Sequence, residues 1–560
     1  MSDSVERTME AEPLKGGQEE VGKPNGHGCA GKVGISKMSG CRTAIFLVSV
    51  FLCLSVIFAF SFILPCPVRP QYLHSWNVTL PAAATYDFLA VADASKDKVQ
   101  DVFFIYKSAE GRMNRNCTDE GLSSPCLFVL AVDGTKGRTI WEQPLSAEFA
   151  WAQCDVGEVG DKRKICLVAH DDDKLTAINI YTGEILWQRS RPTAANSSFP
   201  VISLPDLDKD EISDIAVLSY PAHNTTLVEL VFLSGKSGNM TGSKVDVNMA
   251  LGRMIAHHHY ATSSQAQYLL LHTDSGLFAL GMWRLAESAQ VQSKLKQEKS
   301  WEKKADTAGL IPLYSSDSLQ RVMKVNVGSS SSSPPLLLLT DSTLMLFNTH
   351  TFTITWSTNT TNTSNLLSTP SFGHFNKDGV LDIMLEEDLK NETKRVLVIN
   401  GQTGSELWEV HLPFQSQNPR PASVLTNNYY SVFMMWGDSY TRPNDTSLVN
   451  GERSLYLLYP LHSNVLLEKR IPSQNITAFK ATLLERGRHA CYFILTGENG
   501  GAGFQGEEPV ILTKRKVKGN VSRSAVLKVS GADGLSEDVS PQLAESVREA
   551  FHRLRFSSDQ

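Results

Sequence analysis

One pattern recurs along this 560-residue chain and restricts its fold more than any other feature. It consists of an apolar strand, a turn rich in Asp, Asn, Gly or Thr, and a second short strand that often ends in Trp. Four copies end at Trp141, Trp187, Trp356 and Trp408, and residues 228–242 form a similar copy without the Trp. The first two Trp residues lie 46 positions apart and the last two lie 52 positions apart, so the pattern is a repeat.

A repeat of this length and content is what one blade of a β-propeller requires. A single hairpin cannot bury both of its faces, whereas stacked four-stranded blades can, and closure into a ring leaves only short edges. We therefore predict an all-β fold in which residues 65–535 form a propeller of about seven blades, with eight as the near alternative. Ser540, followed by Leu543, Val547 and Phe551 at helical spacing, predicts a capped amphipathic helix within the terminal segment 536–560.

The charge balance restricts the function. Lys and Arg total 53 and Asp and Glu total 59, which gives a formal net charge of -6, so bulk charge does not favour binding to nucleic acid. Hydrophobic residues make up 42% of the chain and charged residues 20%, so the chain can bury a large core and is not disordered throughout. We expect no nucleic-acid partner.

A membrane-spanning helix is predicted at residues 43–64. These 22 positions carry no charge and are rich in Leu, Phe, Ile and Val, and about 20 such residues cross a bilayer core. A cleaved signal peptide is the alternative, but its apolar core is shorter and 42 residues precede this one. Four basic residues precede the span within about 20 positions, whereas only Arg69 follows it closely.

This asymmetry predicts a single-pass type II protein, with its C-terminus outside, at the cell surface or in a secretory-pathway membrane. Residues 1–42 carry six acidic and six basic side chains, are rich in Gly and Ser, and are predicted to form a disordered cytoplasmic tail. Cys41 adjoins the inner end of the span, and whether it is palmitoylated is left open.

Eleven Asn-x-Ser/Thr sequons agree with this topology, because every one follows the predicted span. One sequon arises easily by chance, but this one-sided set predicts a glycosylated lumenal or extracellular domain. The predicted attachment sites are Asn77, Asn116, Asn196, Asn224, Asn239, Asn359, Asn362, Asn391, Asn444, Asn475 and Asn520.

Six cysteines also follow the span, in a compartment that permits disulfides. Their spacing favours two bridges, each closing a short loop between strand-like segments: Cys117 with Cys126, and Cys154 with Cys166. Cys66 and Cys491 are left over, and three fates stay open for them: pairing, remaining free, or linking two chains. No Cys-x-x-Cys pair is present, which disfavours thiol-disulfide catalysis and zinc ribbons.

An acidic segment supplies the strongest chemical signal. In PDLDKDEISDI, Asp206, Asp208, Asp210 and Asp214 occupy positions 1, 3, 5 and 9 between apolar strands. Two carboxylates about 4 Å apart repel each other by roughly 4 kcal/mol at an effective dielectric of 20, so several converge only where water screens them or a cation joins them. Oxygen ligands favour Ca²⁺, with the backbone carbonyl of Ile212 completing the predicted set.

Two further segments fit the same frame, and any ion held there would chiefly rigidify a blade. The alternative is that all three are solvated turns whose Asp side chains cap backbone amides. The frame is not an EF-hand, because no bidentate Glu stands at position 12. It selects Asp93, Ser95, Asp97, Val99 and Asp101 in one segment and His374, Asn376, Asp378, Val380 and Asp382 in the other.

These segments resemble the FG-GAP repeats of integrin-alpha-type propellers, which read D-x-D/N-x-D-G-x-x-D, and the Trp-ended hairpins look like quinoprotein blades. With the anchor and the sequons, the chain resembles the integrin-alpha FG-GAP-repeat-containing family of single-pass membrane proteins over residues 70–530. The resemblance implies a propeller braced by structural Ca²⁺ and a receptor-like or adhesion-like role. Lys98 and Glu211 depart from the frame by replacing its glycine, and His374 replaces its first Asp.

Common enzyme signatures are missing from the sequence, which contains no GxxxxGK[ST] loop, G-x-S-x-G elbow or H-E-x-x-H helix. His257, His258 and His259 cannot all bind one metal from a strand, because successive residues face opposite sides. We interpret residues 171–173 as an exposed turn and the hairpin Trp residues as packing anchors.

We therefore predict a binding module for an unidentified lumenal or extracellular protein rather than an enzyme. A propeller-type enzyme and a lumenal trafficking or structural adaptor are the alternatives, because a propeller fold alone does not define a function.

Overall fold

The computed structural model divides the chain into two compact units, Met1–Pro70 and Gln71–Gln560. Of the first unit, the structure describes residues 40–63. Of the second unit it describes residues 73–557 with the exception of 74, 147, 157–163, 172–173, 191–200, 220–226, 249–251, 292–293, 326–332, 361–365, 391, 416–418, 441–451, 472–474, 485–488, 502–507, 520 and 532–533.

The first unit contains helix α1 (Gly40–Ile63), which covers almost all of the predicted span. Its described side chains are exposed and mostly apolar, as Phe46, Phe51 and Phe58 illustrate. A search of the described residues finds no helix with the length and apolarity that a membrane crossing needs. The anchoring role of this segment therefore stays a prediction.

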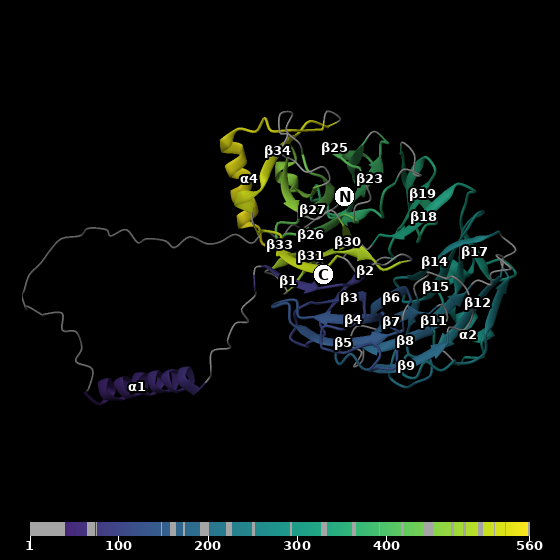
Figure 1. The fold of residues 1–560 in the computed structure, drawn as a ribbon, viewed down its shortest axis with the longest axis horizontal. Helices are drawn as coiled ribbons and strands as arrows, with labels where there is room; N and C mark the ends of the chain where they lie inside the picture. The colour runs from purple at the N-terminus through teal and green to yellow at the C-terminus, as the bar shows by residue number, and fades with distance from the viewer. Residues whose placement is uncertain are drawn as a thin grey trace, which may run out of the picture. The chain divides into compact units, whose positions relative to one another are not determined.

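The second unit is an all-β propeller, and its sheets follow one another around a ring (Figure 1). Blade I contains β2 (Ala84–Ala92), β3 (Asp101–Ser108), β4 (Cys126–Val132) and β5 (Thr139–Leu145), and blade II contains β6 (Phe149–Val156), β7 (Ile165–His170), β8 (Lys174–Asn179) and β9 (Ile185–Ser190). Blade III contains β10 (Ile202–Leu204), β11 (Asp214–Ser219), β12 (Leu227–Leu233) and β13 (Val245–Asn248). Blade IV contains β14 (Met254–Ala261), β15 (Gln267–Thr273), β16 (Gly276–Gly281) and β17 (Leu310–Ser315).

Blades V to VII continue the same antiparallel order. Blade V contains β18 (Leu319–Lys324), β19 (Leu336–Thr340), β20 (Thr343–Asn348) and β21 (Thr353–Asn359). Blade VI contains β22 (Ser371–Gly373), β23 (Asp382–Asp388), β24 (Thr393–Ile399) and β25 (Glu406–Pro413). Blade VII contains β26 (Ala422–Leu425), β27 (Ser431–Asp438), β28 (Arg453–Leu458) and β29 (Val465–Ile471), and β34 (Ala525–Val529) and β35 (Leu535–Ser536) extend its sheet.

Blade VIII closes the ring with strands from both ends of the propeller. Its first three strands are β30 (Ile476–Leu483), β31 (Ala490–Thr496) and β33 (Val510–Lys516), and its outer strand is β1 (Ser75–Leu80). β1 pairs antiparallel with β33 from Ser75↔Arg515 to Leu80↔Val510. The two-residue strand β32 (Glu498–Asn499) pairs in parallel with β2 of blade I, so the last blade also contacts the first through its backbone.

The predicted propeller is confirmed, but its blade number is eight and the expectation of about seven was wrong. The Trp-ended repeat did not reveal the full count because blades III, IV, VII and VIII have no such Trp in a hairpin from their third to their fourth strand. Blade IV instead inserts α2 (Met282–Ser288) and α3 (Lys299–Glu302) between its last two strands. Although α3 lies in a segment rich in Lys and Glu, Trp301 is fully buried and packs against Tyr260 and Tyr268.

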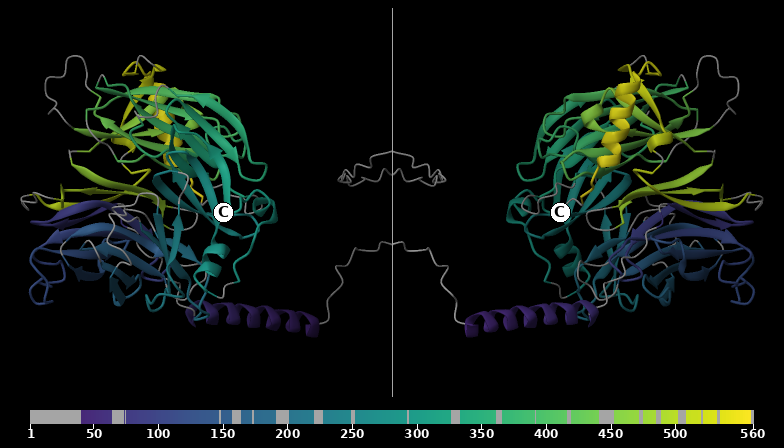
Figure 2. Two further views of the ribbon diagram at one scale, coloured as in Figure 1. Left: turned by 90° about the vertical axis from the view of Figure 1, so that its right-hand side faces the viewer. Right: turned by 90° about the vertical axis from the view of Figure 1, so that its left-hand side faces the viewer.

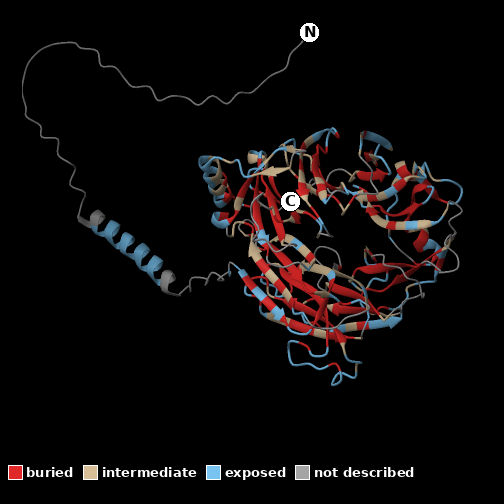
Figure 3. Ribbon diagram, turned by 45° about the horizontal axis from the view of Figure 1, so that its top comes forward, coloured by how far each residue is buried: buried red, intermediate tan, exposed pale blue. Residues whose placement is uncertain are grey.

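The central strands of the blades form the core, as the buried segments in Figure 3 show. Every residue of β3, β4 and β15 is buried, because these strands are covered by neighbouring blades on both faces. The predicted terminal helix is confirmed as α4 (Pro541–Arg553), and Ser540 caps it by accepting the Leu543 N–H at 3.3 Å. Val547 and Phe551 bury its apolar face against blade VII (Figure 2).

Trp residues of the outer strands join five of the eight blades to the blade that follows. The Trp187 indole Nε1–H of blade II donates to the Gly235 carbonyl of blade III at 3.0 Å, and that of Trp356 in blade V donates to the Gly401 carbonyl of blade VI at 2.8 Å. Trp76, Trp141 and Trp408 make the same kind of bond across three more blade boundaries, to Gly134, Ile180 and Ser463. The interpretation of these Trp residues as packing anchors agrees with this geometry.

The two short 3₁₀ turns, η2 (Pro460–His462) and η3 (Val521–Arg523), lie in the connections of blades VII and VIII. η2 provides the blade VII turn that receives the Trp408 bond, since the accepting carbonyl belongs to Ser463 directly after it. η3 contacts α4, so it helps to hold the terminal helix on the propeller.

A glycine substitution tests this blade-to-blade contact. Gly404 has φ +75°, and a Cβ there would lie 2.5 Å from the Trp356 ring, whereas Gly121 has φ +72° and a Cβ there would meet no atom of the described residues within 4 Å. We expect Gly404→Ala to lower the free energy of unfolding by about 3 kcal/mol and Gly121→Ala by about 1 kcal/mol, because both strain the backbone but only the first displaces the indole. Urea unfolding of the purified chain measures both; equal losses would contradict the role of the Trp contact.

Candidate functional site

The two faces of the propeller disc carry different loops. Because the strands of each blade alternate in direction, the loops from the first to the second strand and from the third to the fourth strand open on the same face. All three predicted acidic segments, 93–101, 206–214 and 374–382, join the first to the second strand, in blades I, III and VI. We call this side of the disc the aspartate face and the other side the opposite face.

The three acidic loops have one backbone conformation, as the common frame predicts. The fourth and sixth positions of each loop lie in the left-handed region, including the positions where Lys98 and Glu211 replace glycine. Their φ values are 61° and 68° at Lys96 and Lys98, 68° and 66° at Lys209 and Glu211, and 62° and 81° at Lys377 and Gly379.

The last Asp of each loop is buried and ties two turns of its blade together. Asp214 accepts the backbone N–H of Leu207 at 2.7 Å with one oxygen and that of Gly235 at 3.0 Å with the other. Leu207 belongs to the acidic loop and Gly235 to the hairpin turn between the third and fourth strands. Asp214 therefore holds the acidic loop against the turn that receives the Trp187 bond.

Asp101 and Asp382 occupy the same place in blades I and VI. Asp101 accepts the Gly134 N–H at 3.0 Å and Asp382 accepts the Gly401 N–H at 3.1 Å, and each also accepts an amide of its own loop. Burial raises the pKa of Asp101 and Asp214 to about 6 and also raises the pKa of Asp382, while the backbone N–H donors oppose the shift. These three carboxyls thus act within the blades, whereas the other acidic positions face outward.

The blade III loop brings three carboxylates together at the surface. Asp206, Asp208 and Asp210 each offer an oxygen, and these oxygens lie within 4.8 Å of one another; no other group of three or more His, Cys, Asp or Glu in the described parts of the chain does so. Asp206 and Asp208 are exposed and Asp210 is half-buried. Hard oxygen donors in this arrangement suit a divalent cation such as Ca²⁺.

The same carboxylates also cap the loop backbone. Asp206 accepts the N–H groups of Lys209 at 2.6 Å and Glu211 at 2.9 Å, and Asp210 accepts that of Ile212 at 3.0 Å. These bonds fit the alternative in which the Asp side chains stabilise a turn. The geometry is therefore compatible with both predictions, an ion site and a capped turn.

The blade I and blade VI loops repeat the caps but not the cluster. Asp93 accepts the N–H of Asp97 at 3.1 Å, and Asp97 accepts that of Val99 at 2.8 Å. In blade VI, Asp378 accepts the Val380 N–H at 2.8 Å and the Asn376 side-chain amide at 2.9 Å.

Two remaining members of the frame take part through their backbone groups. Ser95 donates its N–H to Asp101 at 2.8 Å, and His374 exchanges backbone and hydroxyl hydrogen bonds with Ser431 of blade VII. His374 therefore links two blades through its backbone N–H and carbonyl groups.

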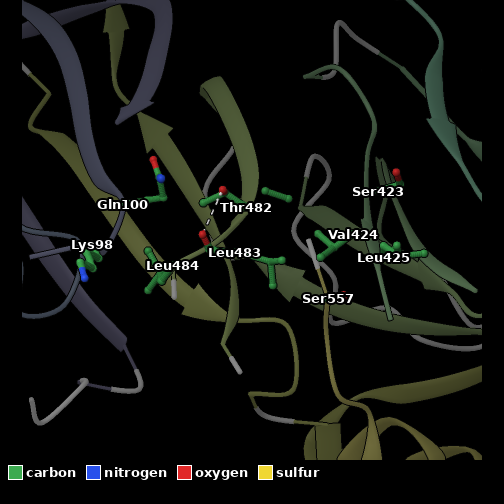
Figure 4. Close-up of a pocket in the computed structure, with 10 residues that line it drawn as sticks. Lys98, Gln100, Ser423, Val424, Leu425, Thr482, Leu483, Leu484 and Ser557 are labelled. Atoms are coloured by element: carbon green, nitrogen blue, oxygen red, sulfur yellow. Dashed lines mark hydrogen bonds between the residues drawn. The ribbon is translucent and has the colours of Figure 1, made fainter. Parts of the chain in front are cut away.

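Two cavities lie on the aspartate face beside the blade I loop. The larger, of about 360 Å³, is bounded on one side by Lys98 and Gln100, on the other by Ser423 and Leu425 of blade VII, with β30 of blade VIII between them (Figure 4). No sequence motif pointed to this cavity, because its walls come from four distant segments, including Ser557 near the C-terminus.

The smaller cavity, of about 250 Å³, is lined by Asp93, Lys96, Gln100, Lys164 and Tyr181. Gln100 lines both cavities, so the two adjoin each other along the blade I loop. Both volumes come close to the lower end of the range of about 300 to 1,000 Å³ that ligand pockets span.

The His triplet lies on β14, as the strand interpretation requires. His257 is almost fully buried, and His259 shares a hydrogen bond with Gln267. Burial, together with the neighbouring His257, His272 and Lys324, lowers the pKa of His258 to about 4. Among the described residues these three imidazoles do not belong to the one group of side chains that could hold a metal ion together.

Both predicted disulfides are present. Cys117 pairs with Cys126, whose Cα atoms lie 5.8 Å apart, and Cys154 pairs with Cys166. Cys491 is free and buried in β31, which excludes an intermolecular bridge from that position without local unfolding. Cys66 lies outside the described residues.

Two other predictions are only partly covered by the structure. Asp171 follows β7 directly and pairs with Lys174 at 3.1 Å, consistent with the predicted turn, while the next two residues lie outside the described parts. Of the sequons, Asn77, Asn116, Asn239, Asn359 and Asn475 are described and all five are exposed. Outside the described residues lie Asn196, Asn224, Asn362, Asn391, Asn444 and Asn520.

Comparison with known proteins matches residues 76–557 to the FAM234A/B beta-propeller family. Protein FAM234A of Rattus norvegicus is 33% identical over 94% of this chain and 92% of its own length, and that of Homo sapiens is 31% identical over the full length of both. Protein FAM234B of Mus musculus is 29% identical over 81% of this chain and 74% of its own. Among solved structures, the WD40 domain of SCAP from fission yeast is 12% identical, with a TM-score of 0.42 over 81% of this chain and 97% of that one.

The match confirms the predicted propeller fold, whereas the finer assignment to the integrin-alpha FG-GAP-repeat-containing family stays a prediction. The most regular feature of the D-x-D-x-D frame, its last Asp, accepts backbone hydrogen bonds within a blade of this chain. A short acidic turn next to a buried strand is thus weaker evidence of family than of fold.

The buried carboxylate can be tested against an exposed one in the same loop. Asp214→Asn keeps the shape but places an amide N–H₂ against a backbone N–H, so we expect the free energy of unfolding to fall by about 2 to 4 kcal/mol. Asp208→Asn, at an exposed position, should change it by less than about 0.5 kcal/mol. Both are measured by urea unfolding in the presence of a calcium chelator. A small effect of Asp214→Asn would contradict its role in joining the two turns.

Proposed function

The chain belongs to the FAM234A/B β-propeller family, and we propose that its propeller is a protein-interaction module whose aspartate face receives the partner. The module is held by a single N-terminal membrane anchor, with the propeller on the lumenal or extracellular side. The partner on that side is a protein. The proposal combines the established propeller fold with the distinct surface of the aspartate face.

The observation that carries the proposal is the distribution of exposed apolar side chains. Among the described residues of the second unit, eight large apolar side chains are exposed, and six of them lie in loops or at strand ends of the aspartate face. Tyr429 is 70% exposed and Leu461 is 54% exposed, both in turns of blade VII. Exposed aromatic and aliphatic groups that gather on one side of a protein are typical of partner-binding surfaces. The six are Leu73, Ile185, Met240, Ile354, Tyr429 and Leu461.

The sequons have the reverse distribution. Asn116, Asn359 and Asn475 lie in loops or at strand ends of the opposite face, Asn77 lies on the edge strand β1, and only Asn239 of the described sequons lies on the aspartate face. Glycans are bulky and would shield the surface near their attachment sites. If the predicted sequons are occupied, the glycans would cover mainly the face that carries fewer exposed apolar groups.

The proposed anchor rests on the sequence of residues 43–64 and on the basic residues before it. The chain enters the propeller through β1, so the propeller follows the anchor after about ten residues of connecting sequence. A tether of this kind suits a module that acts at a membrane, at the cell surface or within the secretory pathway.

We propose in addition that Asp206, Asp208 and Asp210 bind Ca²⁺ weakly and stabilise blade III. Millimolar Ca²⁺ should then raise the unfolding temperature of the purified chain by a few degrees relative to chelator, since a ligand that binds only the folded state stabilises it. Asp208→Asn should abolish this rise, and the matched change Asp378→Asn in blade VI, where no such cluster forms, should leave it. No rise with the unmodified chain would remove Ca²⁺ from this loop.

The face that receives the partner can be identified by adding glycans. Lys136→Asn with Arg138→Thr creates a sequon in an exposed turn of the aspartate face, whereas Asp341→Asn completes one with Ser342 and Thr343 in a turn of the opposite face. We expect the first glycan to abolish the cross-linking of partner proteins to the chain in cells, and the second glycan to leave this cross-linking unchanged.

Each variant should gain one glycan that a glycosidase removes, which serves as the control for folding and for the lumenal placement. Retention of every cross-linked protein by the first variant would contradict a partner on the aspartate face. Failure of both variants to be glycosylated would instead contradict the lumenal placement.

A further inference from the structure

The charged residues that line the two cavities of the aspartate face are mainly cationic, although the chain as a whole is acidic at -6. Lys98 lines the larger cavity, and Lys96 and Lys164 line the smaller one, against the single carboxylate of Asp93. Asp93 already accepts the backbone N–H groups of Asp97 and Lys98, at 3.1 and 2.9 Å. The local excess of positive charge therefore favours an anionic group in these cavities.

The lysines of the blade I loop are available for such a group. Lys96 and Lys98 are exposed, and no acidic side chain in the described parts of the chain lies within ion-pair distance of either. The Lys96 ammonium lies 4.1 Å from the centre of the Tyr181 ring, which places it at the wall of the smaller cavity. An anion that entered there would not need to displace an existing ion pair of these two lysines.

The backbone beside the larger cavity already accepts an extended segment. Residues 555–557 of the chain lie antiparallel to the end of β26: Asn427 donates its N–H to the Arg555 carbonyl at 2.9 Å, and Ser557 donates its N–H to the Leu425 carbonyl at 3.0 Å. Ser557 and Leu425 both line the cavity. The inner edge of blade VII therefore binds a strand at the cavity wall.

The remaining wall is formed by the innermost strand of blade VIII. Thr482 and Leu483 of β30 and the adjoining Leu484 line the cavity, and they are half-buried or buried rather than covered by a further strand. In Figure 4 they stand between Gln100 on one side and Val424 and Leu425 on the other. An extended chain that enters the cavity thus meets apolar side chains, strand edges and lysines together.

We infer that the paired cavities bind an extended acidic peptide segment of the partner protein. Its backbone lies along the inner strands of blades VII and VIII, and its carboxylates face Lys98 and Lys96. Main-chain hydrogen bonds provide affinity in this mode of recognition and side chains provide specificity. The inference rests on the proposed function and deepens it, because it names the chemistry of the segment that the aspartate face receives.

The test uses a library of random eight-residue peptides displayed on yeast and the purified, glycosylated full-length chain as bait. We expect selected peptides to be enriched in Asp and Glu. Lys96→Glu should lower the affinity of the chain for a selected synthetic peptide at least five-fold, whereas Lys209→Glu should lower this affinity less than two-fold. Lys209 is the matched control because it occupies the same loop position with the same left-handed backbone, φ 68° against 61°, in blade III, away from the cavities.

A second variant tests the cavity without changing its charge. Thr482→Trp places a large side chain at a half-buried position of the cavity wall and should also lower the affinity for the peptide at least five-fold. An unchanged unfolding temperature of this variant is the check on folding. Selection of peptides without acidic enrichment, or equal losses for Lys96→Glu and Lys209→Glu, would overturn the inference. Binding of free glutamate with the same affinity as the peptide would also overturn it, because the proposed site recognises a strand.

The outcome is separable from that of the proposed function. If an added glycan on the aspartate face removes the cross-linked partner but Lys96→Glu and Thr482→Trp do not, the face is correct and the peptide site is wrong. If neither the glycan nor these variants affects the partner, the proposed function itself fails.

Discussion

The architecture depends on how the backbone of one glycine is held from two blades. In blade III, the Gly235 N–H donates to the buried Asp214 of its own blade, and its carbonyl accepts the indole N–H of Trp187 from the blade before. A Cβ on Gly235 would lie 2.0 Å from the Ser213 carbonyl oxygen, so no larger residue fits between these partners. The same arrangement recurs at Gly134 and Gly401, and it sets both the spacing of neighbouring blades and the position of the acidic loops. The loops of the aspartate face are thus carried by a rigid frame, which is the condition for a loop surface to recognise a partner.

The sequence predicted those parts of the fold that rest on local patterns. The Trp-ended hairpins, the two short-range disulfides, the C-terminal helix and the common frame of the acidic loops all involve residues close together in the chain, and each was found. The eighth blade was not counted, because its outer strand β1 lies some 430 residues before its partner β33 and contains no hairpin of its own. The burial of Trp301 could not be predicted either, because its sequence neighbours are Lys and Glu and the side chains that pack around it, Tyr260, Tyr268 and Phe352, lie far away in the chain.

The site shows the same division. Spacing placed four aspartates of the blade III loop at one turn, and the structure brings together the side chains of Asp206, Asp208 and Asp210, but it directs Asp214 inward to two backbone amides. A pattern of alternate acidic residues does not distinguish a ligand from a cap, because both uses place an oxygen acceptor on a tight turn. The cavities were beyond any pattern, since Lys98, Leu425, Thr482 and Ser557 meet only after blades VII, VIII and I have closed the ring.

The closing strand also orders events during synthesis. β1 leaves the ribosome before any other strand of the propeller, but the backbone groups it pairs with belong to Val510–Lys516, close to the end of the chain. Until those residues are made, Trp76 and Val78 have no blade in which to bury their side chains, and the N–H and C=O groups of β1 remain an open edge. Such a long-range pairing folds slowly and exposes the nascent chain to wrong strand partners for most of translation. The ring can therefore close only after nearly the whole chain has been synthesised.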